Sequence, residues 1–299
     1  MLRKRTEYSR SSDLPPFTLS GFPGLETSQH WMFLLFGILY IVSIVGNALI
    51  LFIIKEVQSL HKPMYYFLSL LSVNDLGVSF STLPTVLATF CLREIGFDSY
   101  MAQMFFIHLF SFMESGVLLV MSFDRYVAIC NPLPVVIRGF CMVFPLPFLL
   151  KRLSFCKANV LSHPYCLHPD LIRLPCGDIT INNIFGQFIV ISNFGLDSAL
   201  ILLSYMLILR SVLAIASREE RLKTLNTCVS HMCAVLMFFV PMVGVSMAAR
   251  YGRHAPQYVH TLMSLIYLFV PPMLNPVIYS IKTKEIRQRL CKILLGTRF

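Results

Sequence analysis

Charged side chains are scarce in this sequence, in which Asp, Glu, Lys and Arg together make up 13% of 299 residues. A soluble domain of this length needs about a quarter of its residues charged to keep its surface hydrated. Hydrophobic residues reach 56% of the chain instead. The shortage of charge excludes an ordinary soluble fold and predicts that lipid surrounds most of the side chains.

Motifs for catalysis are also missing. The sequence contains no glycine-rich phosphate loop, no nucleophile elbow and no zinc-protease helix. We therefore expect neither an enzyme nor a bound cofactor. The net charge of +10 could indicate a nucleic-acid partner, but the basic residues occur in short clusters between apolar runs rather than along one face. This pattern favours a lipid bilayer as the partner, and no nucleic acid.

No segment near the N-terminus has the charged start, short apolar stretch and small-residue cleavage site of a leader peptide. Met1 to Gln29 is polar and rich in Ser, Pro and Arg. We expect residues 1–30 to form an extracellular tail and the first apolar run to act as the insertion signal.

Several apolar runs are long enough to cross a bilayer, whose core of about 30 Å needs about 20 helical residues. Six clear runs lie at Trp31 to Ile54, Met64 to Leu87, Met101 to Cys130, Phe185 to Leu209, Thr224 to Ala248 and Tyr258 to Ile281. A seventh, Leu133 to Leu150, is short and carries both Arg138 and several prolines. We predict an all-α membrane protein, a seven-transmembrane helix bundle over residues 31–281 with a shortened fourth helix.

The basic residues predict the orientation of the bundle. With seven spans, thirteen Lys or Arg lie on the side of the C-terminus, against seven near the membrane on the other side. This excess predicts a cytoplasmic C-terminus and an extracellular N-terminus. In the cytoplasmic tail, residues 282–299, Ile286, Leu290, Ile293 and Leu294 follow helical spacing between bases, which predicts a short amphipathic helix along the inner membrane surface. A frayed polar tail is the alternative.

Two carboxylates, Asp75 and Glu114, lie about midway along predicted spans. A charge inside a membrane needs a partner or a purpose, and two carboxylates facing one cavity could hold a cation such as sodium or share a proton. Hydrogen bonds to neighbours such as Asn47 and Asn275 are the alternative. A transporter using the pair is a further alternative, although the chain lacks the paired half-length segments of many transporters. Asp197 has no assigned role.

A latch for a switch lies at the cytoplasmic end of the third span. Arg125 can be held by the adjacent Asp124 in one state and released in another, and Tyr126 completes the motif. Prolines inside several spans, among them Pro84 and Pro241, remove backbone hydrogen bonds and permit the kinks that such a switch needs.

The string Met121 to Leu133, MSFDRYVAICNPL, resembles the hallmark of odorant receptors, which are rhodopsin-like G-protein-coupled receptors. Further matches in the family's order are Gly46 with Asn47, PMYYFL from Pro63, KTLNTCVSH from Lys223 and PMLNPVIYSIK from Pro272. The stretches LSGFPGLE, VPMVGVSMAARYG and KTKEIRQR resemble the fish-like class I branch, which is associated with water-soluble odorants, carboxylic acids among them.

This resemblance implies a receptor in the plasma membrane that binds a small odorant and activates a heterotrimeric G protein of the olfactory stimulatory type. Arg125 would then engage the G protein, and the seventh helix would switch through Asn275, Pro276 and Tyr279. Helix packing is the alternative role of these three residues.

Candidate ligand contacts lie in the outer halves of two spans. His108, Phe112 and Ser115 are spaced to share one helix face, and Ser246 and Arg250 repeat the spacing of four residues. Arg250 could hold a carboxylate by paired, charge-assisted hydrogen bonds. An arginine that reaches for lipid headgroups is the alternative.

The nine cysteines cannot all pair within the chain. In the family, a cysteine at the outer end of the third helix pairs with the following extracellular loop, and here Tyr100 stands in its place. The resemblance leaves Cys156 and Cys176 as the expected disulfide and Cys166 without its usual partner, unless Cys91 substitutes.

The family pattern also continues after Leu133 with an intracellular loop and the inner part of the fourth helix, which this chain lacks. The alternative to a working receptor is therefore a truncated family member that inserts or signals poorly.

Overall fold

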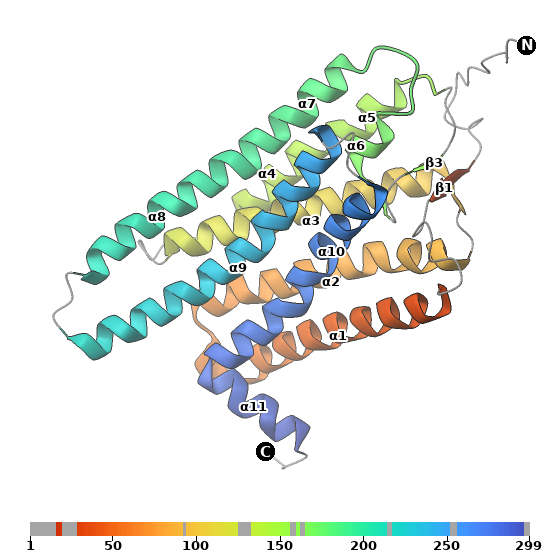
Figure 1. Ribbon diagram of the computed structural model, residues 1–299. Helices are drawn as coiled ribbons and strands as arrows, with labels where there is room; N and C mark the ends of the chain where they lie inside the picture. Colours follow the sequence, from red (N-terminus) through yellow and green to blue (C-terminus); the bar gives the residue numbers. More distant parts are fainter. Residues whose placement is uncertain are drawn as a thin grey trace, which may run out of the picture.

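The computed structural model describes residues 16–19, 29–91, 94–124, 133–155, 160–161, 165–213, 217–251 and 256–295. These residues form a bundle of long helices with a small sheet at one end (Figure 1). The longer helices are α1 (Gln29–Glu56), α2 (Pro63–Cys91), α3 (Phe97–Asp124), α4 (Leu133–Val143), α5 (Pro145–Lys151), α7 (Thr180–Val190), α8 (Leu196–Leu213), α9 (Arg218–Tyr251), α10 (Gln257–Lys282) and α11 (Lys284–Leu294). Short helices are η3 (Gln58–Leu60), α6 (His168–Leu171) and the π-helical η4 (Ile191–Gly195), which joins α7 to α8.

Six helical segments of the described chain are long and apolar enough to cross a membrane. They are α1, α2, α3, α9, α10 and the continuous segment α7, η4 and α8. These correspond to the six clear runs of the sequence. The helices α4 and α5, which lie between α3 and α7 in the chain, are each shorter than a span.

A three-stranded sheet joins the tail to two loops, which the sequence analysis did not predict. It has the order β2 (Glu94–Ile95), β1 (Phe17–Leu19), β3 (Val160–Leu161), with β1 antiparallel to β2 and parallel to β3. Phe17 and Leu19 point inward and are buried. Strands of two or three residues are too short for a recognisable alternation. We call this end of the bundle the sheet end and the opposite end the α11 end.

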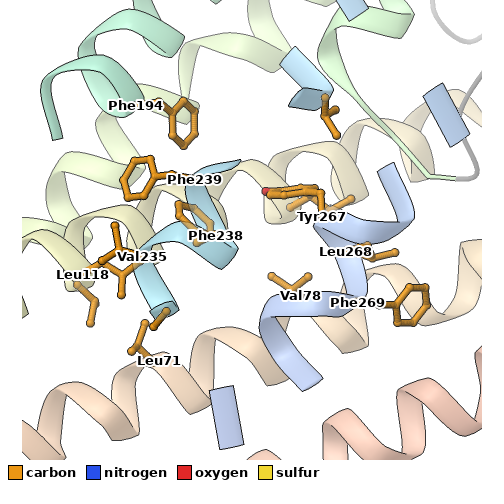
Figure 2. Packing of buried hydrophobic residues seen from close by; sticks show 14 of the residues in the cluster. Leu71, Val78, Leu118, Phe194, Val235, Phe238, Phe239, Tyr267, Leu268 and Phe269 are labelled. Carbon is orange, nitrogen blue, oxygen red and sulfur yellow. The ribbon is translucent and has the colours of Figure 1, made fainter. Parts of the chain in front are cut away.

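The helices pack around an aromatic centre, shown in Figure 2. Phe194 of η4 contacts both Phe238 and Phe239 of α9, and Phe238 contacts Tyr267 of α10. These rings are tilted or edge-on, arrangements that favour aromatic pairs beyond their burial. The centre therefore fixes α9 and α10 against the α7 to α8 segment.

Close packing of α1 on α10 depends on a glycine and a proline. Pro276 has no N–H, so the carbonyl oxygen of Pro272 loses its helical donor. Asn47 of α1 supplies a donor, because its Nδ2 lies 2.8 Å from that oxygen. Gly46 permits the approach, since a Cβ there would stand 3.3 Å from the Pro276 side chain. The GN and NP motifs of the sequence are thus one interhelical contact.

The fourth segment starts well inside the bundle. Gly116 of α3 faces Val135 of α4 so closely that a Cβ on the glycine would overlap the valine side chain. Gly116 lies eight residues before the end of α3 at Asp124, so α4 begins about 10 Å short of that end.

At the α11 end, α11 contacts α1 and α10 (Figure 1). Ile286 is fully buried among Ile50, Ile53 and Ile54 of α1, and Leu290 and Ile293 pack against the same cluster. The apolar stripe of the tail is therefore turned toward the bundle.

Candidate functional site

A cavity of about 50 Å³ lies among α3, α7, α9 and α10. Its walls are mostly apolar, and residues 167–169 close one side. The polar side chains that line it are His108, Ser111, His168, Ser246 and Tyr267. A water molecule needs about 10–15 Å³ of such space, so the cavity in this shape admits only a small molecule. Concave apolar walls with a few polar groups are typical of ligand sites.

Three predicted ligand residues, His108, Phe112 and Ser246, line this cavity together. The Nδ1 atom of His108 lies 2.8 Å from the carbonyl oxygen of Met104, which can only accept a hydrogen bond. Nδ1 therefore carries a proton, and Nε2 is the ring atom that can face a ligand. Of the other two predicted residues, Ser115 does not line the cavity and bonds to Asp197 instead. Arg250 lies near the end of α9, and its side chain is outside the described part of the chain.

Ser111 and Tyr267 are cavity residues that the sequence reasoning missed. Their hydroxyl groups are hydrogen-bonded to each other, which joins α3 to α10 at the cavity wall. Ser111 lies three residues after His108 and four before Ser115, so the helical spacing that selected those two residues also contained it.

Below the cavity, a polar cluster explains Asp197. The Asp197 carboxylate accepts a hydrogen bond from Ser115 of α3 at 2.7 Å and forms an ion pair with Arg138 of α4 at 2.9 Å. Arg138 also donates to the Asn193 side chain at 2.6 Å. Asp197 is 1% exposed and Arg138 32% exposed, so the two charges meet at the edge of the bundle interior. We call these four residues the Arg138 cluster; it binds α4 to α3 and α8.

The second carboxylate site lies at a similar depth in the bundle, since its Glu114 directly precedes Ser115 on α3. Asp75 and Glu114 are both buried, and Asn275 donates from Nδ2 to the Asp75 carboxylate at 3.1 Å. Glu114 interacts with Asp75 and Asn275 as well. The structure thus brings together three predicted residues from α2, α3 and α10. Asn47, the other proposed neighbour, bonds to Pro272 instead.

The predicted latch falls mostly outside the described chain. Asp124 is the last residue of α3, and its side chain is not described; Arg125 and Tyr126 lie outside the described residues. In α10, Asn275 and Pro276 are buried, and Tyr279 packs against α11 and α1 residues of the cluster around Ile286.

The loop that closes the cavity is held by Tyr100, the residue in the place of the family's cysteine. The Tyr100 hydroxyl donates to the carbonyl oxygen of Leu167 at 2.8 Å and accepts from the Leu167 N–H at 3.0 Å. Next to it, the Cys166 N–H donates to Gln103 at 3.1 Å. Tyr100 is fully buried. A pair of hydrogen bonds thus connects α3 to the loop.

The cysteines nearby fit this arrangement. Cys166 is a free, buried thiol, so the alternative pairing with Cys91 is not formed. Burial raises the pKa of the Cys166 thiol, and the nearby Asp170 raises it further. Cys176 is disulfide-bonded, and its predicted partner Cys156 lies outside the described residues.

We expect Tyr100→Phe to lower surface abundance several-fold. The substitution keeps the ring but leaves the buried N–H of Leu167 unpaired, at about 1–3 kcal/mol, and removes one of the donors to the Leu167 carbonyl oxygen, which still accepts from the Asp170 and Leu171 N–H groups. It should also speed alkylation of Cys166 at pH 7.4, because an opened loop hydrates a thiol that is otherwise kept protonated by burial. Flow cytometry of a tagged receptor and mass spectrometry of the alkylated loop measure the two effects.

The matched control is Tyr258→Phe, since Tyr258 is an exposed tyrosine on α10. If Tyr100→Phe behaves like this control in both assays, the hydrogen bonds to Leu167 do not hold the loop. For the same reason, Tyr100→Cys removes both hydrogen bonds and should lower surface abundance unless a new bond to Cys166 forms.

Comparison with solved structures identifies the fold. The crystal structure of squid rhodopsin superposes with a TM-score of 0.71 and 18% sequence identity, over 94% of this chain and 85% of the rhodopsin chain. The helix arrangement is therefore that of the rhodopsin fold.

Sequence comparison then gives the family. The family model described as olfactory receptor matches residues 36–297. Olfactory receptor 51I2 of Homo sapiens is 57% identical over 295 residues, which cover 93% of this chain and 95% of that protein. Olfactory receptor 51I1 of Homo sapiens is 56% identical over 292 residues, covering 92% and 93%. The chain belongs to the olfactory receptor family, whose members are signalling receptors and not enzymes, and the resemblance found in the sequence is confirmed.

Proposed function

We propose that this multi-pass membrane protein is an odorant receptor that binds a small carboxylic acid in the cavity among α3, α7, α9 and α10. The observation that carries the proposal is the mostly apolar cavity with His108 and Ser246 in its wall, within a chain of the olfactory receptor family. His108 would contact the ligand through Nε2, and Phe112 would pack against its hydrocarbon part. Arg250, at the end of α9, would hold the carboxylate.

In this proposal the bundle crosses the plasma membrane seven times, with α4 and α5 together as the shortened fourth span. Their 19 residues from Leu133 to Lys151 extend about 28 Å as a helix, slightly less than the bilayer core. The N-terminal tail, 1–30, is extracellular, the receptor domain occupies 31–281, and the tail 282–299 is cytoplasmic with α11 along the inner surface. The basic residues around α11 support this orientation.

Ligand binding would reach a G protein of the olfactory stimulatory type through α3 and α10. Asp124, Arg125 and Tyr126 would form the docking latch, and Asn275, Pro276 and Tyr279 the switch in α10. Asp75 and Glu114 would hold a sodium ion next to Asn275, whose bond to Asp75 supports a shared site. We further propose that Cys176 pairs with Cys156.

The test of this proposal is a cyclic AMP assay with a panel of carboxylic acids, run beside surface labelling. Arg250→Ala should abolish responses to the acids while leaving surface abundance unchanged, because a carboxylate loses its charged partner. Arg173→Ala, which removes an exposed arginine of the loop after α6, is the control.

Undiminished potency of acids in Arg250→Ala would remove that residue from the site. A receptor that reaches the surface and raises no cyclic AMP with any acid would favour the truncated, poorly signalling family member. The short start of α4 is the observation behind that second candidate, because the missing segment belongs to the side where the G protein would bind.

A further inference from the structure

A second hollow of the molecule is a groove on the outside of the bundle, between α1, α10 and α11. Its volume is about 530 Å³, far larger than that of the ligand cavity. The walls are apolar side chains of α1 and α10, and Ser280 and Arg287 supply the polar groups. The groove therefore has an apolar length and a cationic end.

The groove is a built feature of the packing. Its floor includes Gly46 and Pro276, whose contact brings α1 and α10 together. At the α11 end of the groove, α11 is fixed by Ile286, which is fully buried against Ile50. Arg287 is the next residue, so the buried isoleucine holds the arginine at this end of the groove. The side chains of Val42, Val45 and Val277 on the rim are about half exposed.

The dimensions match one lipid leaflet. The α1 residues that line the groove run from Ile41 to Ile50, which spans about 14 Å along the helix. Half of a bilayer core of about 30 Å is about 15 Å. An acyl chain of a lipid that lies against α1 can therefore fill the groove over its whole length while its headgroup stays beside α11.

The charge selects the headgroup. Arg287 lies where the polar part of such a lipid would be, and a guanidinium binds phosphate and carboxylate groups through paired, charge-assisted hydrogen bonds. The rest of α11 adds Lys284, Arg289 and Lys292 against a single acidic residue, Glu285. The cytoplasmic leaflet is the one rich in anionic lipid.

We propose that the groove between α1, α10 and α11 binds one anionic phospholipid of the inner leaflet, with its acyl chain against Val45 and its headgroup on Arg287. The proposal rests on the cytoplasmic position of α11 in the proposed topology. The bound lipid would link α1 and α11 to the half of α10 that carries Asn275 and Pro276. It would thereby stabilise the helix that the receptor uses as its switch.

The experiment uses the purified full chain in nanodiscs of phosphatidylcholine with or without phosphatidylserine, and native mass spectrometry after extraction into detergent. Phosphatidylserine should remain bound at least about tenfold more often than phosphatidylcholine, as expected for a charged hydrogen bond. Arg287→Ala should reduce retention of phosphatidylserine to the level of phosphatidylcholine. Val45→Trp, which fills the groove from its exposed rim, should lower retention of both lipids.

Arg289→Ala is the matched control, because it removes the same charge from α11 at a residue that does not line the groove. Equal loss of phosphatidylserine in Arg287→Ala and Arg289→Ala would overturn the proposal, since binding would then follow net charge alone. Equal retention of the two phospholipids would overturn it too. So would retention of a sterol in place of either phospholipid when the disc also contains a sterol. All variants carry Cys291→Ser, which excludes a covalent acyl chain on the exposed cysteine of α11. The assay needs neither odorant nor G protein, so its outcome is independent of the cyclic AMP test.

Discussion

Asp197→Ala should remove most of the receptor from the cell surface. The substitution leaves the Arg138 guanidinium at the edge of the bundle interior with the Asn193 oxygen as its remaining partner among the described residues. Removing one member of a buried ion pair costs about 3–5 kcal/mol, and the partial exposure of Arg138 places the expected loss near the lower value. Such a loss is a large share of the stability of a folded protein, so a drop of more than about tenfold in surface abundance follows. Surface labelling normalised to total receptor measures it.

The double variant Arg138→Ala/Asp197→Ala separates the ion pair from general damage. With both charges absent, no unpaired charge stays in the membrane, so the double variant should recover a substantial part of the surface receptor lost by either single one. Asp98→Ala, which removes an exposed aspartate in the first turn of α3, should stay close to the parent. A double variant as poor as Asp197→Ala would show that the pair is not what holds α4.

Phe112→Ala should shift the preference of the receptor toward longer ligands. The Phe112 ring lines the cavity and stacks on Phe194, with ring centroids 6.1 Å apart, so its removal enlarges a space that now admits only a small molecule. Each further methylene that becomes buried contributes about 0.8 kcal/mol, which is about fourfold in affinity. A series of straight-chain carboxylic acids, scored by cyclic AMP per surface receptor, should therefore show its best length increased by one or more methylenes.

Phe106→Ala is the control for that series, because Phe106 lies on the same helix and is 46% exposed on the outside of the bundle. It should leave the chain-length profile unchanged. A profile in Phe112→Ala that matches the parent would place the ligand elsewhere than against this ring.

The spans could be predicted because their signal is local. A run of about 20 apolar residues is enough to indicate a membrane span, and the motifs around Asn47 and Pro276 lie within such runs. What the sequence did not reveal was that these two motifs form one contact, in which Asn47 replaces the donor that Pro276 lacks. The hydrogen bond joins Asn47 to Pro272, 225 residues further along the chain, and no local spacing encodes it.

The polar clusters show where local reasoning ends. Asp197 had no partner in the sequence because Arg138 belonged to the least regular predicted span. The π-helical turn Ile191–Gly195 adds a further difficulty, because it shifts the helical phase between α7 and α8. A regular period of 3.6 residues does not predict that arrangement. In the same way, the sequence showed only that Tyr100 stands in the place of the family's cysteine. The structure then showed the Tyr100 hydroxyl bonded to Leu167.

The strand β1 ties the beginning of the chain into the roof over the ligand cavity. Thr18 pairs with Glu94 on one side and with Val160 on the other, and the Phe17 ring lies 5.6 Å from that of Tyr100, centroid to centroid. An epitope tag or a fused leader peptide placed ahead of Pro16 leaves this strand pairing intact. A truncation that begins at α1 would instead remove β1 from the sheet above the ligand cavity. Shortened expression versions of the receptor should therefore keep residues 16–19.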